Sequence, residues 1–94
     1  MEKFIINNVD YTKKIDNVPT YILERDPDLA LFNFVIPHKE KSKLDNLILD
    51  KNIIEITYNE KDYVFSGKIH FISRIQDSKP IKDMYSFIGR KILK

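Results

Sequence analysis

The side chains best suited to catalysis or metal binding in this sequence are its two histidines, His38 and His70. His38 follows a proline, and His70 lies on the polar side of an alternating stretch. A zinc site needs three or four ligands, commonly at short spacings, and neither histidine has such a neighbour in the sequence. The pattern therefore predicts no metal site and no cofactor, and it favours a solvent-exposed histidine at each position.

Three carboxylates, Glu24, Asp26 and Asp28, cluster around Pro27. Proline presets the backbone for a turn, and carboxylates beside it can accept hydrogen bonds from nearby amides, so a turn explains the cluster. The sequence also lacks the spaced motifs of phosphate-binding loops, dinucleotide sites, zinc proteases and serine hydrolases. Cysteine is absent, which excludes disulfides and thiolate catalysis. These observations predict that the protein is not an enzyme.

Aromatic and basic side chains occur together in the second half of the chain, as they do in proteins that bind single-stranded nucleic acid. The aromatic residues are Tyr63, Phe65, Phe71, Tyr85 and Phe87, and the candidate nucleic-acid contacts are Lys68, Arg74, Lys82 and Arg90. Alternation assigns most of these aromatic side chains to the core, however, and a net charge of +2 is low for a phosphate-binding protein. Nucleic-acid binding is therefore an alternative function and not the leading one.

The strongest structural signal covers residues 53–75 and predicts two long strands joined by a short polar loop. In the second strand, odd-numbered positions are mostly apolar and even-numbered positions mostly polar, which is the period of a half-buried strand. The loop at residues 59–62 lacks glycine, so we expect a four-residue connection built around a type I turn. Gly67 and Gly89 lie inside strand-like stretches, where glycine marks a bulge or a sharp bend of the kind that closes a small barrel.

Further strands are predicted at residues 3–7, 20–25, 29–36 and 82–93. Residues 29–36 are too apolar for a half-exposed strand, so they form either a central strand covered on both faces or an oligomer contact. Leu44, Leu47 and Ile48 follow Ser42, a candidate N-cap, at helical spacing. The fold class is therefore all-β, a small barrel or sandwich of about six strands with at most one short helix.

A chain of 94 residues fits a single domain, residues 1–94, with enough apolar side chains for one core. No apolar run approaches the roughly 20 residues that span a bilayer, so we expect no membrane partner.

Four stretches follow one another along the chain: FIINNVDYTKKI, VPTYILERDPDLALFNFVIP, IIEITYNEKDYVFSGKI and MYSFIGRKIL. In this order they resemble the N-terminal domain of tail and baseplate (hub-like) structural proteins from phages of Gram-positive hosts. Residues 5–12 match the family's short polar element after the first strand, and residues 24–37 match its pair of strands. Members are usually longer, so residues 1–94 are either the N-terminal module of a longer tail protein or a short protein that stands alone.

The resemblance implies a non-enzymatic structural component of a phage tail, baseplate or related injection particle, located in the virion and assembled in the host cytoplasm. Its partners would be copies of itself in a ring and neighbouring tail proteins, and nucleic acid is not expected as a partner. The expected interface residues come from the apolar strand and the segment after it: Leu29, Leu31, Phe32, Phe34, His38, Leu44, Leu47 and Ile48. The alternatives are a small phage-encoded inhibitor of a host protein and an OB-like module that binds single-stranded nucleic acid.

Overall fold

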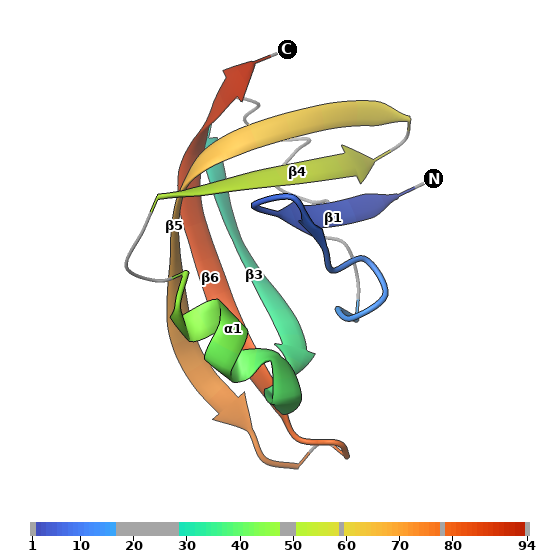
Figure 1. Cartoon of the computed structure of the whole chain (residues 1–94), viewed down its shortest axis with the longest axis vertical. Helices are drawn as coiled ribbons and strands as arrows, with labels where there is room; N and C mark the ends of the chain where they lie inside the picture. Colours follow the sequence, from blue (N-terminus) through green and yellow to red (C-terminus); the bar gives the residue numbers. More distant parts are fainter. Residues whose placement is uncertain (1, 17–28, 48–50, 59, 78, 94) are drawn as a thin grey trace.

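The described part of the chain forms one antiparallel sheet of six strands with a single short α-helix (Figure 1). The computed structural model describes residues 2–16, 29–47, 51–58, 60–77 and 79–93. The strands are β1 (Lys3–Ile6), β2 (Val9–Asp10), β3 (Leu29–Pro37), β4 (Asn52–Tyr58), β5 (Lys61–Ile75) and β6 (Lys82–Leu93). A 3-10 turn, η2 (His38–Glu40), leads into the helix α1 (Lys41–Asp45). The prediction of a small all-β fold is confirmed.

The sheet is curled but does not close into a barrel, which corrects the barrel prediction. Its strand order is β2-β1-β4-β5-β6-β3, and β1 and β3 face each other across the inside of the curl. The ring of Phe4 on β1 lies 6.2 Å from that of Phe32 and 5.2 Å from that of Phe34, both on β3. These rings keep the two strands at the distance of side-chain packing, which is too far for the backbone hydrogen bonds of a closed barrel.

The long strand β5 joins the two parts of the curled sheet. Its first half pairs with β4, and most of its length pairs with β6. Gly67 on β5 pairs with Gly89 on β6. A Cβ on Gly67 would collide with the carbonyl oxygen of Ile88, and one on Gly89 would lie 2.5 Å from that of Ser66. The two glycines are therefore required for the close approach of these strands.

The bulges lie beside the glycine pair and not at it. The register of β5 against β6 shifts between Val64 and Phe65, and again between Phe71 and Ser73. The second shift leaves Ile72 without a paired residue, and its side chain is 49% exposed. The break in the alternation of β5 at Ile72 thus reflects a bulge, which increases the local twist of the sheet.

The turn between β1 and β2 is a tight two-residue hairpin turn. Asn7 and Asn8, between β1 and β2, have φ angles of 48° and 71°, a conformation that asparagine tolerates and that two-residue hairpin turns require. The predicted four-residue loop between β4 and β5 is wrong, because Tyr58 already pairs with Lys61. Only two residues connect these strands, and Glu60 adopts a φ of 64°.

The strand β3 is the last strand in the sheet order and alternates between buried and exposed side chains. The prediction of a central strand covered on both faces is therefore wrong, and the alternative of an oligomer contact stays a prediction. The predicted strand at residues 20–25 and the turn at Asp26-Pro27-Asp28 lie outside the described residues.

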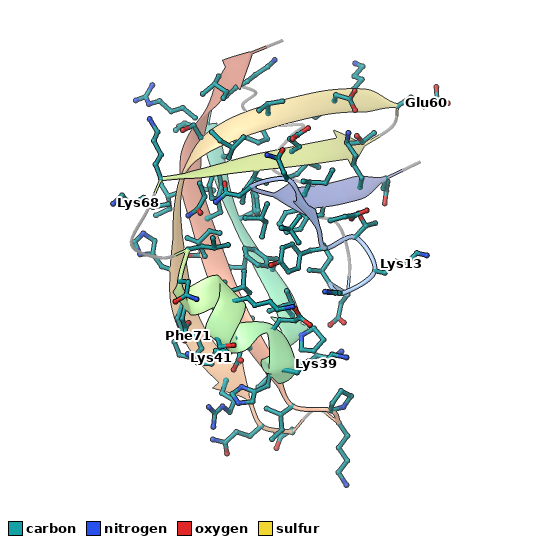
Figure 2. The ribbon with its side chains drawn as sticks, in the orientation of Figure 1. Lys13, Lys39, Lys41, Glu60, Lys68 and Phe71 are labelled. Carbon is teal, nitrogen blue, oxygen red and sulfur yellow. The ribbon has the colours of Figure 1, made fainter. Side chains whose placement is uncertain are left out.

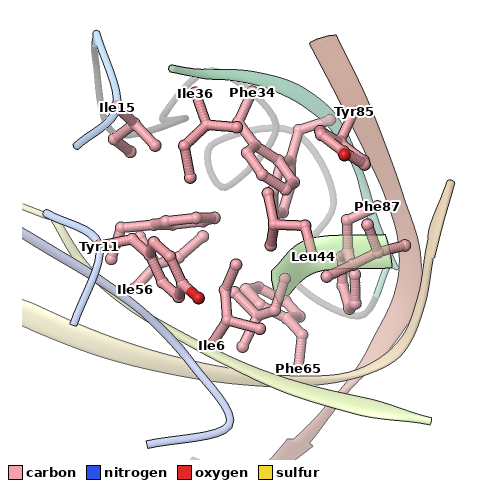
Figure 3. Packing of buried hydrophobic residues seen from close by; sticks show 14 of the residues in the cluster. Ile6, Tyr11, Ile15, Phe34, Ile36, Leu44, Ile56, Phe65, Tyr85 and Phe87 are labelled. Carbon is pink, nitrogen blue, oxygen red and sulfur yellow. The ribbon is translucent and has the colours of Figure 1, made fainter. Parts of the chain in front are cut away.

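The core fills the inside of the curl, and α1 covers it at one end (Figure 3). Its members come from β1, β3, β4, β5 and β6, with Tyr11 and Ile15 added from the segment after β2. Leu44 is the fully buried residue of α1, and burying a leucine side chain contributes about 1.5–3 kcal/mol. The N-cap of α1 is Glu40, so the predicted cap at Ser42 is wrong, and Ser42 lies inside the helix.

Candidate interaction surface

The outer face of β3, β5 and β6 combines exposed apolar side chains with basic ones. Ile88 of β6 pairs with Lys68 of β5 on one side and with Leu31 of β3 on the other. In the next row, Arg90 of β6 pairs with Leu29 of β3. We call these five residues, Leu29, Leu31, Lys68, Ile88 and Arg90, the basic patch.

The three apolar residues of the basic patch have highly exposed side chains. Leu31 is 56% exposed, Ile88 51% and Leu29 47%, whereas the inward-facing Phe32 and Phe87 are buried. Isolated exposed apolar residues are common on protein surfaces, but three adjacent ones on paired strands form a patch. Such a patch marks a surface that another molecule can cover.

The charges on this half of the outer face have one sign. The outward-facing residues of β3, of β6 and of β5 from Ser66 to His70 include the basic Lys68, His70 and Arg90, and none of these described positions holds a carboxylate. Lys68 lies on the outer side of β5, away from the core (Figure 2). The surface therefore suits a partner that brings apolar groups together with negative charge.

The other half of the outer face carries a row that contains two carboxylates, with Lys3 of β1 on the same face beside it. Cross-strand pairing aligns Asp10 of β2, Ile5 of β1, Glu55 of β4 and Val64 of β5 in one row. We call these four residues the acidic row. Asp10 is exposed, and the other three are partly exposed. Hydrogen bonds donated by the Thr12 hydroxyl (2.6 Å) and the Thr12 backbone N–H (2.8 Å) lower the pKa of Asp10 and keep it charged.

A second group of charged residues lies where α1 and η2 meet the end of the β5–β6 pair. His38 Nδ1 donates a hydrogen bond of 2.8 Å to Oδ2 of Asp83, a fully buried carboxylate on β6. Arg74 Nε lies 3.7 Å from the other oxygen, Oδ1, which accepts no hydrogen bond from the described residues. The backbone N–H of His38 also donates to the Ile81 carbonyl at 2.9 Å. These contacts fasten η2 to the sheet.

One further hydrogen bond, from Tyr85 to Asp45, attaches α1 to the same region of the sheet, and a second one, within α1, holds the Asp45 carboxylate. Tyr85 on β6 donates a hydrogen bond of 3.1 Å to Oδ1 of Asp45, and Lys41 Nζ donates one of 2.6 Å to Oδ2. The Lys41 ammonium also lies 4.6 Å from the centre of the Phe71 ring, so Lys41 and Phe71 are neighbours in Figure 2. Burial, together with Asp45, raises the pKa of Tyr85, while the bond from Lys41 lowers the pKa of Asp45.

The chemistry available at His38 is limited. A histidine held by a buried carboxylate can act as an acid or base when a reacting group lies beside it. Within the described residues, the only side-chain hydrogen bond of His38 is the one to Asp83. The described residues also contain no group of three or more potential metal ligands. The side-chain bond of His38 to Asp83 and its backbone bond to Ile81 hold η2 against the sheet, which is a structural role. His38 was expected to be a solvent-exposed loop residue, but it is only half-exposed and bound to Asp83.

The structure divides the predicted interface residues into two groups. Leu29 and Leu31 are exposed, and His38 is partly exposed. Phe32, Phe34 and Leu44 are buried in the core, and their contact with a partner stays a prediction. Leu47 packs partly buried against the core, and Ile48 lies outside the described residues. The sequence analysis did not include Ile88 among the interface residues. Ile88 is exposed because it follows the buried Phe87 on β6 and points to the opposite face of the sheet.

The groups proposed for nucleic-acid binding do not form a stacking platform. Phe65, Tyr85 and Phe87 are fully buried, so of the five aromatic residues only Phe71 and Tyr63 have exposed ring area. Among the basic contacts, Lys68 and Arg90 lie in the basic patch. Arg74 and Lys82 are engaged elsewhere: Arg74 pairs with Asp83, and Lys82 Nζ donates a hydrogen bond of 2.8 Å to Asp16.

Comparison with known proteins found no matching protein family, no similar curated protein and no similar solved structure. In the described part of the chain, no helix is long and apolar enough to cross a membrane.

Proposed function

We propose that this chain is a non-enzymatic assembly protein that binds copies of itself and neighbouring proteins through the outer face of its sheet. The observation that carries the proposal is the pair Leu31 and Ile88, which lie directly opposite each other on β3 and β6 and are both more than half exposed. Directly opposed side chains on antiparallel strands form one continuous surface. Covering that surface removes apolar area from water, which favours association.

The specific assembly that we propose is a phage tail, baseplate or related injection particle. The support is the resemblance of four consecutive stretches to tail structural proteins, together with a small sheet that presents an apolar outer surface. In such a particle the chain would form a ring with copies of itself and contact adjoining tail proteins. A stable contact buries on the order of 800 Å² on each partner.

Sedimentation velocity over a range of protein concentrations tests the assembly function. We expect the wild type to form oligomers and the Ile88→Thr variant to associate about tenfold more weakly, because a polar group replaces part of the apolar contact. Ile81→Thr is the matched control, since Ile81 is 43% exposed but lies outside the basic patch. A wild-type chain that stays monomeric at millimolar concentration would contradict self-assembly.

A further inference from the structure

The acidic row and the basic patch have complementary compositions. Each contains apolar side chains, and each contains two charged ones of a single sign: Asp10 and Glu55 in the acidic row, Lys68 and Arg90 in the basic patch. Both surfaces lie on the outer face of the same sheet. Within the described residues, neither Glu55 nor Lys68 forms an ion pair inside its own copy. Each surface can therefore engage charges on another molecule.

Charge repulsion disfavours a symmetric pairing in which the same surface of two copies meets. Two basic patches placed face to face would bring Lys68 and Arg90 of one copy against the same residues of the other, and like charges at an interface are unfavourable. Two acidic rows face the same obstacle. A contact between the acidic row of one copy and the basic patch of another instead satisfies both the charges and the apolar groups.

The two surfaces lie over strands that run in different directions. In Figure 1, β1 and β4 run across the view, whereas β3 and β6 run along the long axis of the molecule. The acidic row and the basic patch share no residue and are separate surfaces. Each copy can bind one neighbour through its acidic row and a second through its basic patch.

We propose that copies of this chain associate head to tail, with the acidic row of one copy seated on the basic patch of the next. The proposal rests on the assembly function proposed above and names the two surfaces that meet. A contact between unlike surfaces is heterologous, and repetition of it forms a ring if the rotation closes and a filament if it does not. The occupant of the basic patch is thus a second copy of the same chain.

A charge-exchange experiment tests this pairing. The Glu55→Lys variant has a positive charge at both positions 55 and 68, and the Lys68→Glu variant has a negative charge at both, while Asp10 and Arg90 are unchanged. We expect each variant alone to associate at least about tenfold more weakly than the wild type in sedimentation velocity at low ionic strength. An equimolar mixture of the two variants should associate again, because every contact between unlike variants then joins opposite charges.

Matched controls separate this pairing from a general effect of charge. Glu60→Lys, in the turn between β4 and β5, and Lys39→Glu, in η2, make the same changes at exposed positions that belong to neither surface, and Figure 2 shows both apart from Lys68. Both variants should associate like the wild type. The double variant Glu55→Lys/Lys68→Glu in one chain should also associate. Circular dichroism of each variant tests whether it is folded. Association of the two single variants in the mixture would show independently that both are folded, because unfolded chains could not form the contact.

The outcomes distinguish the two proposals. Loss of association in both single variants, recovery in the mixture and particles larger than a dimer would support the head-to-tail contact. If the charge variants associate normally while Ile88→Thr does not, or if the mixture stays dissociated, the pairing is wrong and the assembly function stands. Assembly that stops at a dimer would also overturn the head-to-tail arrangement. A monomeric wild type would overturn self-assembly itself and the pairing with it.

Discussion

At the scale of single residues, Asp83 is the side chain whose role the fold most clearly defines. It lies in phase with the buried Tyr85 and Phe87 on the inner side of β6. A buried carboxylate is costly unless hydrogen bonds or opposite charges compensate it. His38 and Arg74 supply that compensation from opposite sides of the carboxylate. The cluster thus ties three separate parts of the chain together.

The two histidines allow a matched test of this role. We expect His38→Ala to lower the free energy of unfolding by about 1–3 kcal/mol, because it removes the hydrogen bond to a buried carboxylate. His70→Ala should change it by less than about 0.5 kcal/mol, since His70 is an exposed residue of β5. Urea denaturation at neutral pH measures both values. Equal effects of the two substitutions would show that the Asp83 contact does not stabilise the fold.

The buried tyrosines predict how stability depends on alkaline pH. Burial raises the pKa of Tyr85, with a further contribution from Asp45, and burial also raises the pKa of Tyr11, with a contribution from Glu40. Above about pH 10 the unfolded chain releases these tyrosine protons while the folded chain retains them. The unfolded state then binds fewer protons, so the free energy of unfolding falls as pH rises.

The Tyr85→Phe variant isolates the contribution of one of these groups. At neutral pH we expect it to be less stable by about 1 kcal/mol, because it loses the hydrogen bond to Asp45. Between pH 10 and 11 its stability should fall less steeply than that of the wild type, as measured by urea denaturation at each pH. If the free energy of unfolding of the variant and of the wild type fell equally with pH, the contribution assigned to Tyr85 would be contradicted.

At the scale of elements, the crossing of β5 and β6 decides the shape of the sheet. Gly67 and Gly89 face each other where β5 passes from its pairing with β4 to its pairing with β6 alone. A side chain at either position would meet backbone atoms of the other strand, which cannot move without breaking the ladder. The curl that holds β1 opposite β3, and the core between them, depends on this contact.

Substitution of one glycine should therefore have a large effect. We expect Gly67→Ala to destabilise the protein by about 3 kcal/mol or more, because the new methyl group overlaps the Ile88 carbonyl oxygen. Ser73→Ala, at an exposed position of the same strand, is the control and should be nearly neutral. Thermal and urea denaturation measure both. A Gly67→Ala variant as stable as the control would show that the strands can separate at little cost.

At the scale of the whole molecule, the outer face carries an acidic row and a separate basic patch, although the net charge of the chain is only +2. Net charge therefore understates the electrostatic character of this surface. The basic patch contributes apolar area as well as charge, so its association should respond to both. The effect of salt separates the two contributions, because salt screens charges at the surface and leaves apolar contacts in place.

We expect self-association to weaken as sodium chloride rises from about 0.05 M to 0.5 M, where the screening length falls well below 10 Å. Sedimentation velocity across this range measures the change, and the Lys68→Glu variant should lose the salt dependence or reverse it. Association that strengthens with salt in the wild type would indicate an apolar contact to which the two charged surfaces contribute nothing.

The sequence by itself determined the local structure of this protein. Alternation of period two identified the long strands and assigned aromatic residues such as Tyr85 and Phe87 to the core. These features depend on neighbours a few residues away, so one stretch of sequence is enough to reveal them.

Only the tertiary structure decided which strands are neighbours and which charges meet. Strand β3 looked central because it is apolar, yet it is last in the sheet order, and a curled sheet buries one of its faces. The pairing of His38 with Asp83, 45 residues apart, and the alignment of Asp10 with Glu55 through Ile5 depend on register between distant strands. Register follows from how the buried faces pack together, which no local pattern contains.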